Sequence, residues 1–185
     1  MIGKPGNNTS EKMVKTIHDF LWDRRVISHA PQYLFQIGLA TVALAVVLLV
    51  EDRIFNAAIV VAIASTAYIV FVIPDSVAAT PRKVLGGHAV AVLVGGVLSY
   101  LFSFTFLGTL AVESRLFFDI IAAASVGLSI LIMVSTNTEH PPAAGTALGL
   151  MFQGFSLNTV AFIMVSALLL CIIRMILRPR LQNLL

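Results

Sequence analysis

The chain has 185 residues, of which 58% are hydrophobic and 11% are charged, whereas about 25% of the residues of an ordinary soluble domain are charged. A mean hydropathy of +0.96 leaves too little polar surface to coat a globule, so the composition excludes a soluble fold and predicts an exterior that faces lipid. The net charge of +3 lies on cations that flank apolar segments, which is typical of topology signals, and no nucleic-acid partner is expected.

Residues 1–30 are predicted to form a cytoplasmic amphipathic segment. Met13, Ile17 and Phe20 recur near helical spacing with charges between them, which favours a helix lying on the membrane surface, and a partly ordered tail is the alternative. The segment has no long apolar run and no small-residue cleavage site, so it is not expected to be a signal peptide. Its mixed charges also disfavour a transit peptide, and a prokaryotic plasma membrane is the simplest location.

Five segments are long enough to cross a bilayer core of about 30 Å, which requires roughly 20 helical residues. The sequence therefore predicts an all-α fold, a polytopic transmembrane helical bundle over residues 31–178 with a short cytoplasmic tail over 179–185. The five predicted full spans cover residues 33–50, 54–73, 84–107, 116–134 and 157–177.

A sixth apolar stretch, residues 143–155, is shorter. Its 13 residues would reach only about 20 Å as a helix, so it is predicted to be a half-helix that either crosses or re-enters the membrane. If it crosses, both termini are cytoplasmic, and ten Lys and Arg residues lie inside against two outside; if it re-enters, the division is seven against five. Because cations are retained on the cytoplasmic side, six crossings are preferred.

Small residues predict where helices approach closely, since helices in lipid associate through packing rather than through the hydrophobic effect. The third predicted span carries such residues at every fourth position, and the half-helix carries a pair, Gly145 and Gly149. We therefore expect these two helices to be in contact. The stripe on the third span consists of Gly87, Ala91, Gly95 and Ser99.

The segment around His140 is the first candidate site. Pro141 and Pro142 are unsuited to a helix interior but suit its first turn, so His140 is predicted to lie at the amino terminus of the half-helix. Partial positive charge and free backbone N–H groups at such a terminus favour an anion. Broken helices of this kind build substrate sites in transporters, although a loop that ends a helix at the surface is the alternative.

A second candidate lies at the start of the third span, where His88 follows Gly86 and Gly87. Two histidines near helix starts could form a proton-sensitive gate, because an unperturbed histidine titrates near pH 6.5. Hydroxyl groups on the second and fourth spans, including Thr66, could solvate an ion or bond their own helix carbonyls. Gln153 is a further pore candidate, because a primary amide is costly to expose to lipid.

Both candidate segments resemble the HPP family of integral membrane proteins, named for the triplet present here as His140, Pro141 and Pro142. The family typically has a Pro-Arg-Asn segment that leads to Gly-Gly-His, and residues 81–88 read PRKVLGGH. It also has His-Pro-Pro-Ala-Gly followed by Ala-Thr-Ala-Leu, and residues 140–148 match with Ala and Gly exchanged. The similarity extends over about residues 30–178.

Two departures from the family pattern change the expectation. Lys83 replaces the usual Asn, and residues 64–68 lack a glycine that is typical of the second span, so this span is expected to be straighter. The resemblance implies a small transporter or channel, and plant relatives are linked to nitrite movement across the chloroplast envelope.

The sequence thus predicts a transporter or channel for a small monovalent anion such as nitrite, in a homo-oligomer embedded in the lipid bilayer. Arg82 and Lys83 would concentrate anions at the cytoplasmic mouth. No enzyme activity, metal or cofactor is expected, and the rival hypothesis is a membrane scaffold or assembly subunit. The predicted substrate-binding residues are Arg82, Gly87, His88, His140, Pro141, Pro142, Ala143, Gly145, Thr146 and Gln153.

Overall fold

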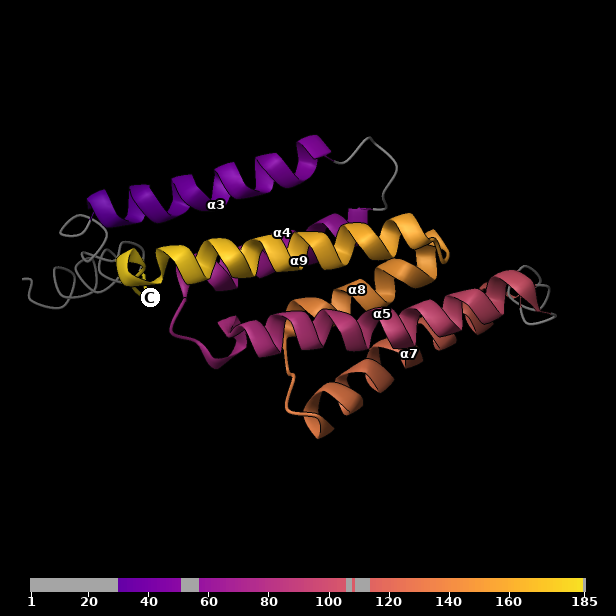
Figure 1. The fold of residues 1–185 in the computed structure, drawn as a ribbon. Helices are drawn as coiled ribbons and strands as arrows, with labels where there is room; N and C mark the ends of the chain where they lie inside the picture. Colours follow the sequence, from indigo (N-terminus) through magenta and orange to yellow (C-terminus); the bar gives the residue numbers. More distant parts are fainter. Residues whose placement is uncertain (1–29, 51–56, 106–107, 109–113, 185) are drawn as a thin grey trace, which may run out of the picture. The chain divides into compact units, whose positions relative to one another are not determined.

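The computed structural model describes residues 30–50, 57–105, 108 and 114–184. Contacts divide the chain into two units, Met1–Phe35 and Gln36–Leu185. Of the first unit only residues 30–35 are described, so the predicted amphipathic segment lies almost wholly outside the described residues. The helices are α3 (Ala30–Val50), α4 (Ala57–Val72), η1 (Val77–Ala79), α5 (Pro81–Phe104), α7 (Arg115–Ser135), α8 (Pro141–Gln153), α9 (Leu157–Leu177) and η2 (Arg178–Arg180) (Figure 1).

Every regular element among the described residues is helical, which confirms the predicted all-α class. Within the part of the chain that the structure describes, three helices, α5, α7 and α9, are long and apolar enough to cross a membrane, while α4 is apolar but has 16 residues. The predicted number of five full spans is therefore not established. On α5 the large apolar side chains that are exposed recur along one helical face as expected for contact with lipid, and they are Leu93, Val97, Tyr100 and Phe104.

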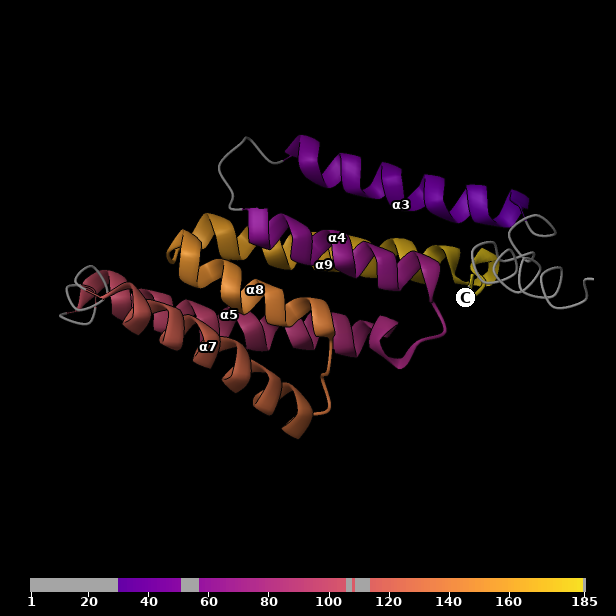
Figure 2. The same cartoon turned by 180° about the vertical axis from the view of Figure 1, so that it is seen from behind.

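The short helix α8 is central in the second unit, where it contacts α4, α5 and α7 (Figures 1 and 2). Successive α5 positions, Gly87 and then Gly95, meet successive α8 positions, Ala143 and then Ala147, so the two helices run in the same direction. Between α8 and α4 the order is reversed, because Gly145 faces Ala62 and the later Gly149 faces the earlier Ile59. Those two helices are therefore antiparallel. Hence α8 runs from one end of the unit toward the other.

Close packing of α5 on α8 depends on the predicted small-residue stripe. A Cβ atom added at Gly95 would lie 2.7 Å from the Ala147 carbonyl oxygen and 2.8 Å from the Ala147 Cα. The predicted contact between these helices is therefore confirmed. The glycine pair of α8 faces α4 instead, because an added Cβ at Gly149 would lie 2.6 Å from Ile59 and one at Gly145 3.5 Å from Ala62.

Residues after α9 return to the end of α4 and hold it. The buried Gln36 side chain accepts from the Gln182 N–H at 3.1 Å and donates to the Gln182 and Phe71 carbonyls at 2.8 and 2.5 Å. The Leu184 N–H donates to the Val72 carbonyl at 2.9 Å. Since the last carbonyls of a helix have no partner within it, these bonds satisfy groups that would otherwise be unpaired.

Arginines at the end of α9 reinforce the same attachment. Arg174 Nη2 donates to the Pro74 carbonyl at 2.7 Å, and Arg178 forms an ion pair with Asp75. The residues predicted as a short tail, 179–185, contact the same loop after α4, because the Asn183 side chain accepts from the Asp75 N–H at 3.0 Å.

Candidate functional site

His88 and His140 meet inside the bundle, with their ring centroids 5.3 Å apart. His88 comes from the second turn of α5 and has no exposed surface, and His140, at the start of α8, is 1% exposed. The two predicted site segments therefore form a single site. A buried ionisable pair in a membrane domain is a functional candidate, because polar groups there are costly.

Thr66 of α4 joins the two histidines. Its hydroxyl oxygen lies 3.0 Å from His88 Nε2 and 3.0 Å from His140 Nε2, and it also lies 3.0 Å from the Ala62 carbonyl oxygen. The outer nitrogens also have partners. His88 Nδ1 lies 3.0 Å from the Thr146 hydroxyl, and His140 Nδ1 lies 2.9 Å from the Ala78 carbonyl oxygen in η1. Each ring nitrogen thus has one partner.

The local sequence explains how His140 reaches this position. Pro141 and Pro142 occupy the first turn of α8, and a residue before proline is excluded from the helical region, so His140 is extended with φ −134° and ψ 99°. Gly87 makes room on α5, because a Cβ atom there would lie 2.6 Å from the His140 Cβ. The His-Pro-Pro sequence and the glycine therefore act together to bury the imidazole.

The loop before His140 carries a second polar group of side chains. The buried Lys83 donates to the Asn137 side chain at 2.5 Å and forms an ion pair with Glu139. Arg82 donates to the Thr136 carbonyl at 3.3 Å. The hydrogen bond from Lys83 holds the pKa of the Glu139 carboxyl below its ordinary value of 4.5. Lys83 is thus paired with a carboxylate, and Arg82 is the more exposed of the two cations.

Glu139→Gln is expected to remove an acid-sensitive part of the protein's stability. Because the pKa of Glu139 is lowered on folding, its ion pair contributes stability above the unfolded pKa and loses it as the pH falls through the folded pKa. Thermal unfolding in detergent should show the wild type losing stability below about pH 4.5, near the unfolded carboxyl pKa, with a weaker loss in the variant. Asp119→Asn is the control, since its pair with Arg115 is exposed. Identical acid profiles for the wild type and Glu139→Gln would contradict the assignment.

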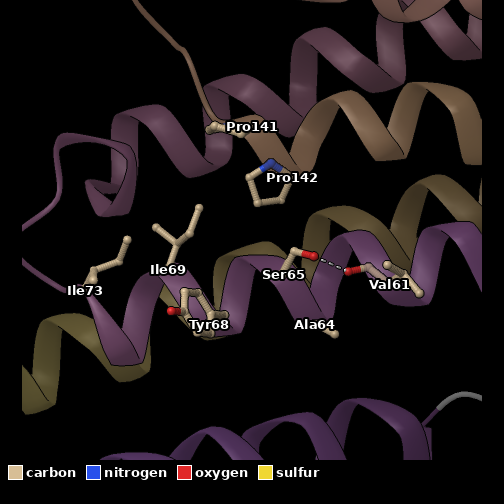
Figure 3. Close-up of a pocket in the computed structure, with 8 residues that line it drawn as sticks. All are labelled: Val61, Ala64, Ser65, Tyr68, Ile69, Ile73, Pro141 and Pro142. Carbon is tan, nitrogen blue, oxygen red and sulfur yellow. Dashed lines mark hydrogen bonds between the residues drawn. The ribbon is translucent and has the colours of Figure 1, made fainter. Parts of the chain in front are cut away.

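Two cavities border the start of α8. One, of about 380 Å³, is lined by His140, Glu139 and Pro141 together with apolar residues of α7. The other, of about 740 Å³, lies between α4 and the two prolines (Figure 3). There Ser65 donates to the Val61 carbonyl of its own helix at 2.8 Å. His140 is among the residues that line the smaller cavity, so this cavity is the candidate route to the buried pair.

Of the remaining predicted site residues, some lie in the histidine cluster and others contact α4 or lie at the far end of α8. Thr146 belongs to the histidine network, whereas Gly145 packs toward α4. The Ala143 N–H donates to the His140 carbonyl at 2.9 Å and is therefore engaged. Gln153 lies at the other end of α8, roughly 20 Å along the helix from His140, where it donates to Thr159 at 3.4 Å. It is not brought to the site.

Sequence reasoning missed the central position of Thr66 and the role of the Ala78 carbonyl. Thr66 was recognised as part of a polar face on the second span, but the same pattern includes Ser65, which bonds only within its own helix in the contacts described. A backbone carbonyl such as that of Ala78 leaves no signal in the sequence at all. The pairing of Lys83 with Glu139 had a signal, the two opposite charges beside the two motifs.

Comparison with known proteins agrees with the membrane character of the chain. The family model described as HPP, transmembrane region, matches residues 27–183. A transmembrane protein of Dictyostelium discoideum is 35% identical over 85 residues, which cover 46% of this chain and 27% of that protein. No solved structure matches the chain. Since the family model spans most of the sequence and includes both histidine motifs, the chain belongs to the HPP family of integral membrane proteins.

Proposed function

We propose that this protein carries a small monovalent anion across the membrane, with nitrite as the first candidate, and that the His88–Thr66–His140 cluster is the centre of the pathway. The observation that carries the proposal is the burial of two imidazoles and two threonine hydroxyls in one hydrogen-bonded cluster. If these side chains only filled space, apolar side chains would be more stable here, since burying polar groups in a membrane is costly. Such groups commonly mark ion pathways.

Protonation of His140 would attract an anion more strongly than the helix terminus does. A helix dipole contributes about 0.3–1 kcal/mol to binding of a charge, and Pro141 and Pro142 provide no N–H donors. Two unit charges 4 Å apart interact by roughly 4 kcal/mol at an effective dielectric constant of 20. In this proposal the anion lies in the 380 Å³ cavity beside His140, and its binding increases when His140 gains a proton.

The arrangement of α8 supports a pathway that crosses the membrane. In the proposal α8 is a short crossing, which gives six crossings with both termini in the cytoplasm of a prokaryote. The parallel packing of α8 on α5 and the attachment of the end of α9 to the loop after α4 support this topology. Arg82 then lies at the cytoplasmic mouth. A homo-oligomer in the plasma membrane belongs to the same proposal.

The rival hypothesis, a scaffold without transport activity, receives less support. That hypothesis would use the small-residue stripe of α5 as a contact between protomers. Within the described part of the chain, Ala91 and Ser99 are buried, and Gly87 and Gly95 face α8 of the same chain. The stripe is therefore occupied within one protomer, which leaves the scaffold hypothesis without its main surface.

Anion uptake by proteoliposomes tests the proposal. Purified wild type, His140→Ala and Gly127→Ala would be compared for nitrite, nitrate, formate and chloride at pH 5.5 and 7.5, on either side of the ordinary histidine pKa. Gly127 is a control position because a side chain there meets nothing within 4 Å. We expect selective uptake that is stronger at pH 5.5 and falls more than about tenfold in His140→Ala, which corresponds to at least 1.4 kcal/mol. Wild-type uptake no greater than that of empty liposomes would favour the scaffold.

A further inference from the structure

We infer that the Thr66 hydroxyl is a two-position donor that allows His140 to take up one proton, so that the anion is moved together with a proton. This inference rests on the proposed function. It follows from counting donors and acceptors around the two imidazoles, which determines where each proton lies.

The Ala78 carbonyl determines which atom donates and which accepts in each hydrogen bond of the network. A carbonyl oxygen can only accept, so His140 Nδ1, 2.9 Å away, must carry a proton. When His140 is neutral its Nε2 is then an acceptor, and the Thr66 hydroxyl donates to it. The Thr66 oxygen is left to accept from His88 Nε2, and His88 Nδ1 accepts from the Thr146 hydroxyl. The two histidines therefore have opposite tautomers.

The Ala62 carbonyl is the second acceptor to which the Thr66 hydroxyl can donate. When a hydronium ion gives one proton to His140 Nε2 and leaves as water, the new N–H donates to the Thr66 oxygen, and the Thr66 hydroxyl turns to the Ala62 carbonyl 3.0 Å away. His88 Nε2–H continues to donate to the same oxygen. One proton is gained, every donor keeps an acceptor, and release of the proton from His140 reverses the change. The positive charge is placed on the histidine that lines the 380 Å³ cavity.

His88 is a poorer position for the added proton. A proton on its Nδ1 would displace the Thr146 hydroxyl, which has no second acceptor in the described part of the chain. The other charged groups near the pair are Lys83 and Glu139, which pair with each other, and Arg82. α4, η1 and α8 carry no charged residue, and the charged residues of α7, Arg115 and Asp119, are at its far end.

The transport test compares Thr66→Val and Thr66→Ser with the control Thr41→Val. Valine keeps the shape but removes the oxygen, serine keeps the oxygen, and the Thr41 hydroxyl donates to the Ile37 carbonyl of its own helix. From pH 7.5 to pH 5.5 uptake by the wild type should rise by up to about 100-fold, because the protonated fraction of a histidine changes up to tenfold per pH unit. We expect Thr66→Ser and Thr41→Val to keep this rise and Thr66→Val to lose it. An unchanged rise in Thr66→Val would overturn the inference and leave the proposed function standing.

Nitrogen NMR of histidine-labelled protein in lipid provides a readout that does not need transport. The four histidines of the chain would be assigned through single histidine variants. At pH 7.5 we expect His88 with its proton on Nε2 and His140 with its proton on Nδ1, and on acidification with nitrite His140 should become doubly protonated first. If the wild type moves no anion, the proposed function and the coupling of anion to proton both fail, and the tautomers still decide the protonation step itself: opposite tautomers support the Thr66 two-position donor, and equal tautomers overturn it.

Discussion

Gly95→Ala is expected to destabilise the protein by roughly 1–3 kcal/mol, the usual cost of overpacking a close contact. The added methyl group would lie 2.7 Å from the Ala147 carbonyl oxygen and 2.8 Å from the Ala147 Cα, both of them backbone atoms of α8. A backbone cannot rotate aside as a side chain can, so α5 and α8 would have to separate. Unfolding by SDS in mixed micelles measures the change in free energy.

Gly127→Ala is the matched control for this substitution. It makes the same change in α7, where an added side chain meets nothing within 4 Å. In water alanine favours a helix by about 1 kcal/mol relative to glycine, so this variant should be neutral or slightly more stable. Equal stability of Gly95→Ala and Gly127→Ala would show that α5 and α8 are not in close contact.

Much of the helical layout could be predicted because it depends on local sequence. The apolar pattern predicts that the third span starts at residue 84 and the half-helix at residue 143, and the corresponding helices α5 and α8 begin at Pro81 and Pro141. Both helices include prolines in their first turn, where the missing N–H costs nothing. The apolar runs alone mark helix interiors, and so they predict the ends less well.

The site could be predicted only in part, since its members come from distant parts of the sequence. His88 and His140 were found because each belongs to a recognisable motif, and Thr66 is separated from them by 22 and 74 residues. No local pattern says which hydroxyl of α4 faces the pair. Residues 57–72 form one continuous helix, and Thr66 of this helix lies within hydrogen-bond distance of both imidazoles.

Lys83 shows how charge alone can mislead a sequence-based interpretation. A cation at the start of a span suggested an anion-attracting mouth, but in the fold the Lys83 side chain is 9% exposed and its ammonium group is bound to Glu139 and Asn137. An ion pair presents little net charge to a distant anion. The partner lies 56 residues away, so the neutralisation depends on the tertiary contact between α5 and the loop before α8.

Gln36→Leu is expected to release the attachment that the Gln36 side chain makes to the end of α4 and to the residues after α9. Leucine has similar volume but cannot replace the bonds to the Phe71 carbonyl and to the backbone N–H and carbonyl of Gln182. Each buried polar group left unpaired costs about 1–3 kcal/mol. The backbone N–H and carbonyl of Gln182 can bond to water once the segment is released. We therefore expect the free energy of unfolding to fall by about 2–4 kcal/mol in all.

Gln182→Leu is the control for this prediction, because the exposed side chain of Gln182 takes no part in these bonds while its backbone does. It should change stability by no more than about 0.5 kcal/mol, as exposed substitutions usually do. Hydrogen exchange of the Leu184 N–H, which donates to the Val72 carbonyl, should increase in Gln36→Leu and stay slow in Gln182→Leu. If both variants exchange as slowly as the wild type, the segment after α9 is held by its apolar contacts through Leu181 and Leu184, both of which are buried, and the Gln36 amide is dispensable.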